Sequence, residues 1–352
     1  MNSRERIARM FNHQEADRIA IFDDPWAATI KRWESEGMPA GSDYIDYLGL
    51  DAIRNFKTDN SPQYEKKVIE ETAEHIIYTS EWGVTMKQWK NAASTPEFLD
   101  FTIVNPETWQ AAKKRMAASP ERIDWAKTKS DFAKWGKEGA WIQAILWFGF
   151  DVSHSWIVGT ERVLMALAED PDWLRDMFDT ELTVQLKLLD ILWDKGYRFQ
   201  AVKWYDDMGF KKNQFFSLSM YRDILKPFHQ RAIDWAKNKG IKTYLHSCGD
   251  INPFVPELVA MGLDMLNPLE VKAGMDPYHL KKTFGDKLAF HGGMNALHYD
   301  NLPLLHSEIE TLIPAMKENG GFVFGSDHSV PSGVSLAEFQ RIIGRAKELG
   351  KY

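Results

Sequence analysis

A short segment, His246-Ser-Cys-Gly-Asp250, combines two residue types that are well suited to hold a metal ion. It follows an apolar run at 241–245 that is flanked by glycines, a pattern typical of a buried strand. An imidazole and a thiol two residues apart on a strand point to the same side, and both are good zinc ligands. Cys248 is the only cysteine, so it has no disulfide partner within the chain. These residues alone also allow a plainer interpretation, in which Cys248 is a small core residue and His246 a hydrogen-bonded core histidine.

The composition argues against several classes of protein. The chain has 352 residues, of which 44% are hydrophobic and 26% charged, as in ordinary soluble globular proteins. Its net charge of −7 argues against a partner such as nucleic acid or an anionic membrane, because both require clustered positive charge. The first residues lack the apolar stretch of a secretory signal, and no apolar run is long enough to cross a bilayer. With a single cysteine, these features predict a cytoplasmic protein.

Strands and helices alternate along the chain from about residue 140 onwards. Strands are expected at 18–22, 140–147, 199–205, 241–246, 263–267, 287–291 and 321–325, with an eighth near 99–104. Helices are expected at 2–13, 29–36, 106–116, 120–135, 160–168, 171–195, 218–238, 253–261, 277–283, 302–318 and 335–350, with a hairpin at 75–90. We therefore predict an α/β fold: a single (β/α)8 TIM barrel with N-terminal helical and hairpin decoration, spanning 1–352 as one domain. An open doubly wound sheet is less favoured, because no glycine-rich phosphate turn follows the first strand.

The expected carboxyl ends of the strands carry mostly polar side chains. In a TIM barrel the active site lies at these ends, so the side chains would converge on one mouth. The residues concerned are Asp23, Asp24, Trp147, Phe148, Asp206, Asp207, His246, Cys248, Asn267, Glu270, His291, Asp327 and His328. Plain structural roles are open for some of them, since either of Asp206 and Asp207 could cap a turn and Glu270 could pair with Lys272.

Three of these residues would make a zinc site. His246, Cys248 and His328 would supply three protein ligands and leave a fourth position open, as in catalytic zinc centres. The alternative ligands, which could instead orient a ligand or move a proton, are Glu270, His291 and Asp327. Spacing cannot decide between them, because the residues come from different strands. Other chemistries have less support, since the sequence has no G-x-S-x-G, P-loop, dinucleotide or H-E-x-x-H motif.

Several longer segments carry a family resemblance. They are Trp204-Tyr-Asp-Asp-Met-Gly209, His246-Ser-Cys-Gly-Asp250, Asn267-Pro-Leu-Glu-Val-Lys-Ala-Gly-Met-Asp276 and His291-Gly-Gly-Met-Asn295. Together they resemble the uroporphyrinogen decarboxylase superfamily, and the segments 23–39 and 162–171 fit the same pattern, so the likeness covers nearly the whole chain. The superfamily is built on a TIM barrel, and it includes decarboxylases of the haem pathway and cobalamin-dependent methyltransferases.

Residues after the first strand separate these two branches. True decarboxylases carry an Arg-Gln-Ala-Gly-Arg-like stretch there, which holds the carboxylates of the substrate. This chain has Asp23-Asp-Pro-Trp-Ala-Ala-Thr-Ile-Lys31 instead, whose acids would repel a polycarboxylate. The methyltransferases use a His-x-Cys pair and a later Cys as zinc ligands. His246 and Cys248 match the pair, and His328 falls about where the later Cys is expected.

The resemblance implies a zinc-dependent methyltransferase. It would move a methyl group between a small molecule, with a methoxylated aromatic compound favoured, and a corrinoid (cobalamin) carried by a partner protein. Zinc would activate the heteroatom that donates or accepts the methyl group. The expected catalytic residues are Asp206, Asp207, Glu270 and His291. The expected substrate-binding residues are Trp26, Trp147, Phe148, Phe150, Trp204 and Asn295.

Two other functions stay open at this point. One is a metal-free decarboxylase that uses Asp206 or Asp207 on a carboxylated substrate. The other is a non-catalytic barrel that binds a corrinoid or another tetrapyrrole without turnover. Metal analysis of the protein would distinguish them best from the zinc methyltransferase.

Overall fold

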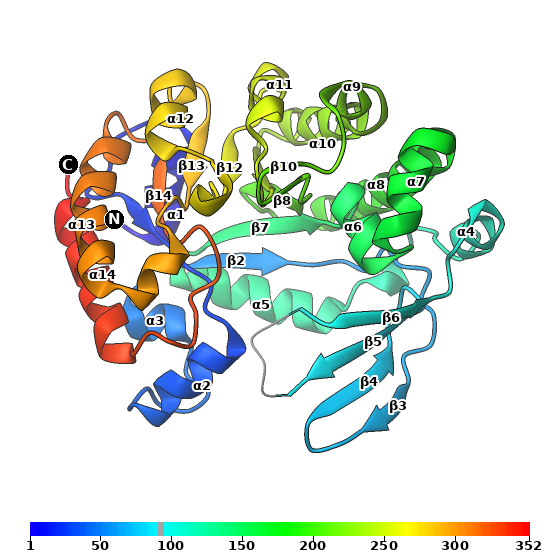
Figure 1. Cartoon of the computed structure of the whole chain (residues 1–352), viewed down its shortest axis with the longest axis horizontal. Coiled ribbons are helices and arrows are strands. Elements are labelled where there is room, and N and C mark those ends of the chain that lie inside the picture. The colour runs from blue at the N-terminus through cyan, green and yellow to red at the C-terminus, as the bar shows by residue number, and fades with distance from the viewer. Residues whose placement is uncertain (91–94) are drawn as a thin grey trace.

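The computed structural model describes residues 1–90 and 95–352, and a curved parallel sheet lies at its centre (Figure 1). Eight strands pair in the order β1-β14-β13-β12-β11-β8-β7-β2, and every ladder between them is parallel. The strands are β1 (Ala20–Ile21), β2 (Ile53–Phe56), β7 (Trp141–Leu146), β8 (Ala201–Tyr205), β11 (Lys242–His246), β12 (Met265–Asn267), β13 (Ala289–His291) and β14 (Phe322–Phe324). The sheet curls into a half-barrel, so the α/β class and the TIM-like architecture are confirmed.

The buried carboxylate of Asp51 connects the two edge strands of this sheet. Its backbone N–H donates to the carbonyl of Ile21 in β1, and its Oδ2 accepts from the Ile21 N–H, both at 2.8 Å. Two arginines balance its charge: Arg6 from the first helix and Arg18, whose guanidinium lies 2.8 Å from Oδ2. Asp51 therefore joins β1 to the segment leading into β2 by hydrogen bonds, as the strand ladders join the other neighbouring strands of the sheet.

Helices surround the curved sheet and most of them connect its strands (Figure 1). They are α1 (Ser3–Phe11), α2 (Ala27–Ser35), α3 (Tyr44–Leu48), α4 (Pro106–Lys113), α5 (Trp125–Glu138), α6 (Phe150–Trp156), α7 (Thr160–Glu169), α8 (Pro171–Asp194), α9 (Leu218–Met220), α10 (Lys226–Asn238), α11 (Val255–Met261), α12 (Pro277–Phe284), α13 (Leu302–Lys317) and α14 (Leu336–Leu349). Their starts follow ordinary capping rules: Asp170 accepts from the Trp173 N–H at 3.3 Å, and Pro171 occupies the first turn of α8. No helix in the described residues is long and apolar enough to cross a membrane.

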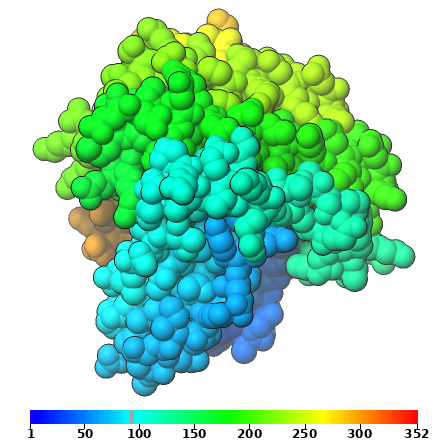
Figure 2. All heavy atoms as spheres, turned by 90° about the vertical axis from the view of Figure 1, so that its right-hand side faces the viewer, coloured from blue at the N-terminus to red at the C-terminus, as the bar shows by residue number. Residues whose placement is uncertain are grey.

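A second, antiparallel sheet lies beside the half-barrel. It has the order β3-β4-β5-β6, with β3 (Val68–Glu71), β4 (His75–Thr79), β5 (Val84–Trp89) and β6 (Glu97–Phe101). In Figure 2 its blue-to-cyan atoms form a lobe below the green helices. The hairpin expected at 75–90 is confirmed as β4 and β5, within this larger sheet.

The prediction of an eighth barrel strand near 99–104 is wrong. That part of the chain forms β6, which pairs antiparallel with β5, whereas the eighth parallel strand is β2. The sequence signal for β2 is weak because the strand has only four residues and its centre, Arg54-Asn55, is polar. Asn55 nevertheless fits the barrel, since its Oδ1 accepts a 2.7 Å hydrogen bond from Gln143 in β7.

Candidate metal centre

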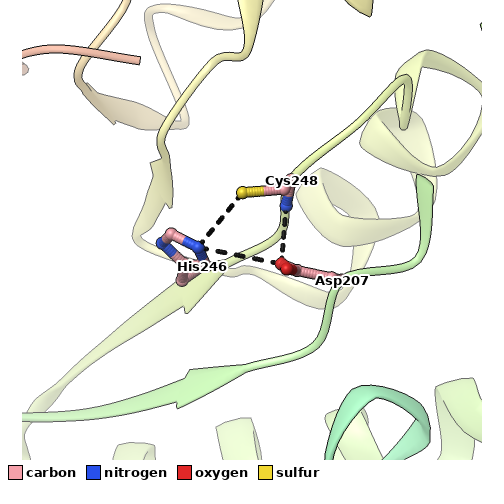
Figure 3. Close-up of side chains that lie close together, drawn as sticks. All are labelled: Asp207, His246 and Cys248. Atoms are coloured by element: carbon pink, nitrogen blue, oxygen red, sulfur yellow. Dashed lines mark hydrogen bonds and ion pairs between the residues drawn. The ribbon is translucent and has the colours of Figure 1, made fainter. Parts of the chain in front are cut away.

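The carboxyl ends of β8 and β11 bring three potential metal ligands together. The two strands pair in register, with His246 opposite Tyr205, so the residues just beyond them are also neighbours. The Nε2 of His246 lies 3.4 Å from the Sγ of Cys248 and 3.7 Å from the Oδ1 of Asp207 (Figure 3). Ligand atoms of all three residues lie within 4.8 Å of one another, and each residue is half-buried. This spacing allows the three side chains to bind one ion.

Backbone hydrogen bonds hold the Cys248 loop in this position. The Cys248 N–H donates to the Oδ1 of Asp207 at 2.7 Å, and the Gly249 N–H donates to the Oε2 of Glu270 at 2.6 Å. Gly249 has a φ of +82°, and a Cβ there would lie 2.0 Å from the carbonyl carbon of Gly209. Only glycine fits at this point, which explains the glycine that follows the cysteine in the sequence.

Asn267 fixes the tautomer of His246. The Nδ2 of Asn267 donates to the carbonyl of His291 at 3.2 Å, which turns its Oδ1 toward the imidazole. The Nδ1 of His246 therefore carries the proton and donates to that oxygen at 2.6 Å. The lone pair is left on Nε2, the nitrogen that faces Cys248 and Asp207. Metal-binding histidines are commonly oriented by such a bond from their other ring nitrogen.

The electrostatics of the three residues fit a divalent cation. Burial, helped by Asp151, raises the pKa of Asp207 to about 8. Burial and the Asp207 charge raise the pKa of the Cys248 thiol well above its usual value. Burial and Lys203 lower the pKa of His246 to about 3, so the imidazole is neutral. A bound cation would supply the charge that stabilises thiolate and carboxylate, and a sulfur, nitrogen and oxygen donor set suits zinc.

Asp206, expected to be catalytic, instead faces away from the cavity and supports the loop. It is fully buried, and its Oδ2 lies 2.8 Å from the Nε2 of His229, whose Nδ1 is 3.1 Å from the Tyr221 hydroxyl. Its Oδ1 accepts from the Asp151 N–H at 2.8 Å. Tyr221 begins a π-helical turn, Tyr221–Leu225, between α9 and α10. Asp206 thus anchors the strand end from which Asp207 projects.

Two of the alternative ligands, Asp327 and Glu270, have other partners. Asp327 is fully buried, and its two carboxylate oxygens accept from the N–H groups of Ala296 and Val271 at 2.8 and 2.9 Å. Glu270 holds Gly249 and also lies 3.3 Å from the Nζ of Lys272. Both carboxylates therefore join loops around the mouth, and neither belongs to the group of three potential ligands.

The two predicted histidines outside strand β11 line the cavity without joining this group. The Nε2 of His291 donates to the carbonyl of Phe22 at 3.0 Å, and its Nδ1 accepts from the Tyr244 hydroxyl. Burial lowers the pKa of His291 to about 3. His328 is exposed, and its ring centroid lies 5.9 Å from that of Trp26. In the described part of the chain, the group of residues that could hold a metal ion contains Asp207 and does not contain His328.

A cavity of about 340 Å³ lies directly against the three ligands. Of the expected residues, its lining includes Trp26, Asp207, His246, Cys248, His291 and His328. It also includes Lys203 and Tyr205, which the sequence analysis missed. Alternation along β8 would have found them, because Ala201, Lys203 and Tyr205 share the face that points into the barrel.

Most of the other expected substrate contacts lie elsewhere in the described structure. Trp204 and Phe148 are fully buried on the outer side of the sheet, where both pack against the His229 ring. Phe150, the first residue of α6, packs against Phe215 and Phe216. Trp147 lines a separate cavity of about 640 Å³ at the antiparallel sheet, and Asn295 caps a 3-10 turn by accepting from the Leu297 N–H. Trp204 and Phe148 are large enough to suggest a pocket wall, but they fill the space between sheet and helices.

The fold and the site define a half-barrel protein with a His-Cys-Asp cluster at the carboxyl ends of its strands. Residues 154–349 match the family model described as uroporphyrinogen decarboxylase (URO-D), so the chain belongs to this family. The structure is also similar to that of a methyltransferase from Methanosarcina mazei, with a TM-score of 0.67 and 12% identity over 99% of this chain and 98% of that one. At this identity the likeness shows a shared fold. No curated protein matches the sequence.

Proposed function

We propose that this protein is a zinc-dependent methyltransferase that moves a methyl group between a small molecule and a corrinoid protein. One observation carries the proposal: His246, Cys248 and Asp207 converge within 4.8 Å at the wall of a cavity. Three protein ligands beside a cavity are typical of catalytic zinc, whose remaining position is open to substrate. The fold shared with an archaeal methyltransferase supports the same reading.

The residues of this chain would have distinct tasks in such a reaction. His246 Nε2, Cys248 Sγ and an Asp207 oxygen would hold the zinc, and the thiol and carboxyl protons would leave when it binds. When bound, zinc supplies a Lewis acid for the heteroatom that carries or accepts the methyl group. Asn267 keeps the His246 lone pair directed at the site, and Glu270 keeps the Cys248 loop in place. The cavity would hold the small molecule beside the ligands, with the Trp26 ring in its wall.

The size and position of the cavity support our proposal for the direction of transfer and for the partner. About 340 Å³ is at the low end of ligand pockets, which suits a small methyl donor such as a methoxylated aromatic compound. A methyl group leaving such an ether needs a strong nucleophile, and a corrinoid on a partner protein would approach from the open mouth. Transfer from substrate to corrinoid is therefore the direction we propose.

The alternative of a porphyrinogen decarboxylase has less support from the cavity. A substrate with many carboxylates would need several cations, whereas the described lining contributes a single lysine, Lys203, and no arginine. The same lining contains the carboxylates of Asp23, Asp24 and Asp207. Like charges facing a polyanion would oppose its binding. The small volume also argues against a barrel that merely encloses a tetrapyrrole.

Metal analysis combined with a methyl-transfer assay tests the proposal. Zinc-loaded protein should hold one ion per chain and should methylate free cob(I)alamin from a methoxybenzoate, with loss of activity after chelation. Replacing Cys248 with Ser should remove most of the zinc while the circular dichroism stays unchanged. The matched control is Ser247→Ala, which alters the adjacent buried hydroxyl that accepts from the Met208 N–H, and it should keep the zinc. Protein that binds no zinc, or activity that ignores the chelator, would overturn the proposal. Coproporphyrinogen formation in an anaerobic assay would favour the decarboxylase instead.

A further inference from the structure

The floor of the cavity contains a buried lysine. Lys203 is only 5% exposed, although β8 places it in the lining of the cavity. Its Nζ lies 4.7 Å from the ring centroid of Tyr205 and 4.5 Å from that of Tyr244. Within the described residues, no carboxylate oxygen lies within 4.0 Å of the Lys203 Nζ. The ammonium is thus surrounded by two aromatic faces and lacks a close anionic partner in that part of the chain.

A charged lysine is unusual in this position. Inward positions of barrel strands are usually filled by branched apolar side chains, and a buried charge without an anion loses its hydration. Burial alone would lower the pKa of Lys203, but Tyr205, Tyr244 and Asp24 act in the opposite direction and the pKa is raised. The side chain therefore keeps its charge, which the two ring faces and the more distant Asp24 stabilise. This charged group lines the cavity, where an anionic group of a ligand would meet it directly.

The nearest acidic residues of the cavity are already engaged. The Oδ2 of Asp23 accepts from the Ser326 N–H at 3.0 Å and from its hydroxyl at 2.7 Å. The Oδ1 of Asp24 accepts from the Tyr44 hydroxyl at 3.1 Å. These bonds hold both carboxylates in the wall, where Asp24 acts on Lys203 through its charge without forming an ion pair with it. They also place negative charge where a second anionic group of a ligand would have to lie.

The position of Lys203 relative to the metal ligands indicates the shape of that ligand. Lys203 pairs in register with Tyr244, two residues before His246, so its backbone lies ~7 Å deeper along the strands. Its side chain reaches back toward the mouth, because Nζ lies 4.7 Å from the ring centroid of Tyr205, the residue that pairs with His246. A compact ligand such as a single substituted aromatic ring can therefore contact both the ammonium and the metal ligands. The aromatic side chains of Phe22, Trp26 and Tyr205 line the same cavity. A flat ring with an anionic group at one end would therefore pair with the Lys203 ammonium and pack against these aromatic side chains.

We propose that Lys203 binds the anionic group of the substrate, and that the substrate is a singly charged methoxylated aromatic carboxylate. The carboxylate would pair with the Lys203 ammonium at the floor, and the methoxy group would face His246, Cys248 and Asp207 at the mouth. This inference rests on the proposed function for the role of the methoxy group. The anion site itself depends only on the cavity and on Lys203. An experiment can therefore contradict the anion site without contradicting the methyltransferase proposal, and the other way round.

Calorimetry with zinc-loaded protein and three matched probes tests the anion site. The probes are 4-methoxybenzoate, the neutral 4-methoxybenzamide and the doubly charged 4-methoxyisophthalate. Wild-type protein should bind the monoanion at least tenfold more tightly than either of the others. In Lys203→Met the preference over the amide should fall below threefold, while affinity for the amide and the zinc content stay within threefold of wild type. Lys203→Arg should recover part of the preference, because it keeps the charge.

Two controls separate recognition from a structural role. Lys242→Met removes a lysine of the neighbouring strand that pairs with Asp264 at 3.0 Å outside the cavity, and it should keep the full preference. Lys203→Met should unfold at the same temperature as wild type or a higher one, since replacing a buried charge by an apolar group of similar size is often neutral or stabilising. A clear fall in melting temperature would instead show that the lysine holds the fold together.

The outcomes distinguish this inference from the methyltransferase proposal. Three results would overturn the anion site. They are equal affinity of wild type for 4-methoxybenzoate and 4-methoxybenzamide, no measurable binding of 4-methoxybenzoate, and a preference for the monoanion that survives Lys203→Met. Lys203-dependent binding without any methyl transfer to cob(I)alamin would support the anion site and count against the methyltransferase. Methyl transfer to cob(I)alamin from neutral methoxyarenes alone would support the methyltransferase and count against the anion site.

Discussion

Two adjacent aspartates provide a sharp test of the metal centre. Asp207 faces the cavity beside His246 and Cys248, whereas Asp206 is fully buried against His229 behind the strand. Replacing each in turn with asparagine removes one negative charge and changes the side-chain volume very little. We expect Asp207→Asn to weaken zinc binding with little effect on folding, and Asp206→Asn to weaken folding with little effect on zinc.

The expected magnitudes follow from what each carboxylate contacts. In Asp207→Asn the amide oxygen can still accept from the Cys248 N–H, so the loop should keep its shape and the loss should fall on the metal. Losing a partner that only orients a ligand costs 10–100-fold in metal affinity, so losing a ligand should cost at least about 100-fold, or ~2.7 kcal/mol. In Asp206→Asn the buried bonds to His229 and Asp151 are weakened, which should cost ~1–3 kcal/mol of unfolding free energy.

Competition with a chromophoric chelator measures the zinc affinity, and urea unfolding of the metal-free proteins measures stability. Cobalt(II) substitution adds a direct readout, because the thiolate charge-transfer band of Cys248 should persist in Asp206→Asn. The reasoning is refuted if Asp207→Asn binds zinc as tightly as wild type. It is also refuted if Asp206→Asn loses as much zinc as Asp207→Asn while remaining folded, because Asp206 would then be the ligand.

Three further substitutions examine the surroundings of the site. Asn267→Leu removes the acceptor that fixes the His246 tautomer and should lower zinc affinity ~10–100-fold by the same competition assay. Gly249→Ala should destabilise the protein by at least ~3 kcal/mol in urea unfolding, because its Cβ would overlap a carbonyl, whereas Gly196→Ala, with the same sign of φ and open space, should cost ~1 kcal/mol. Burial raises the pKa of Asp23 from 3.8 to about 7. The folded protein therefore keeps this proton to a higher pH than the unfolded chain does, and the free energy of unfolding falls as pH rises from about 4 to about 7. The total fall from this group is at most ~4 kcal/mol. Unfolding between pH 5 and 8 should therefore show a shallower fall in Asp23→Asn, and equal slopes would contradict the assignment.

Periodicity in the sequence predicts the barrel because its central strands are short, mostly buried runs between glycines and polar loops. The strands β7 and β11 both appear within one or two residues of the expected bounds. The strand β2 escapes prediction because its stability comes from long-range partners. Asn55 pairs with Gln143, and Asp51 joins the strand's approach to β1. No local pattern shows that a polar tetrapeptide will be covered by contacts so distant in sequence.

The same distinction between local and distant information explains which ligands could be predicted. His246 and Cys248 belong to one strand end, so alternation along the chain is enough to place them on one side. The third ligand must come from another strand, and its identity depends on the register between β8 and β11 and on how the loops beyond them turn. At the β8 end, the buried Asp206 anchor leaves Asp207 as the residue that projects toward the cavity. At the β14 end, Asp327 is the residue that turns inward to bind two backbone N–H groups, which leaves the next residue, His328, on the exposed rim. In each pair one residue secures the loop and its neighbour takes the opposite direction, so the buried partners of Asp206 and Asp327 determine where Asp207 and His328 point.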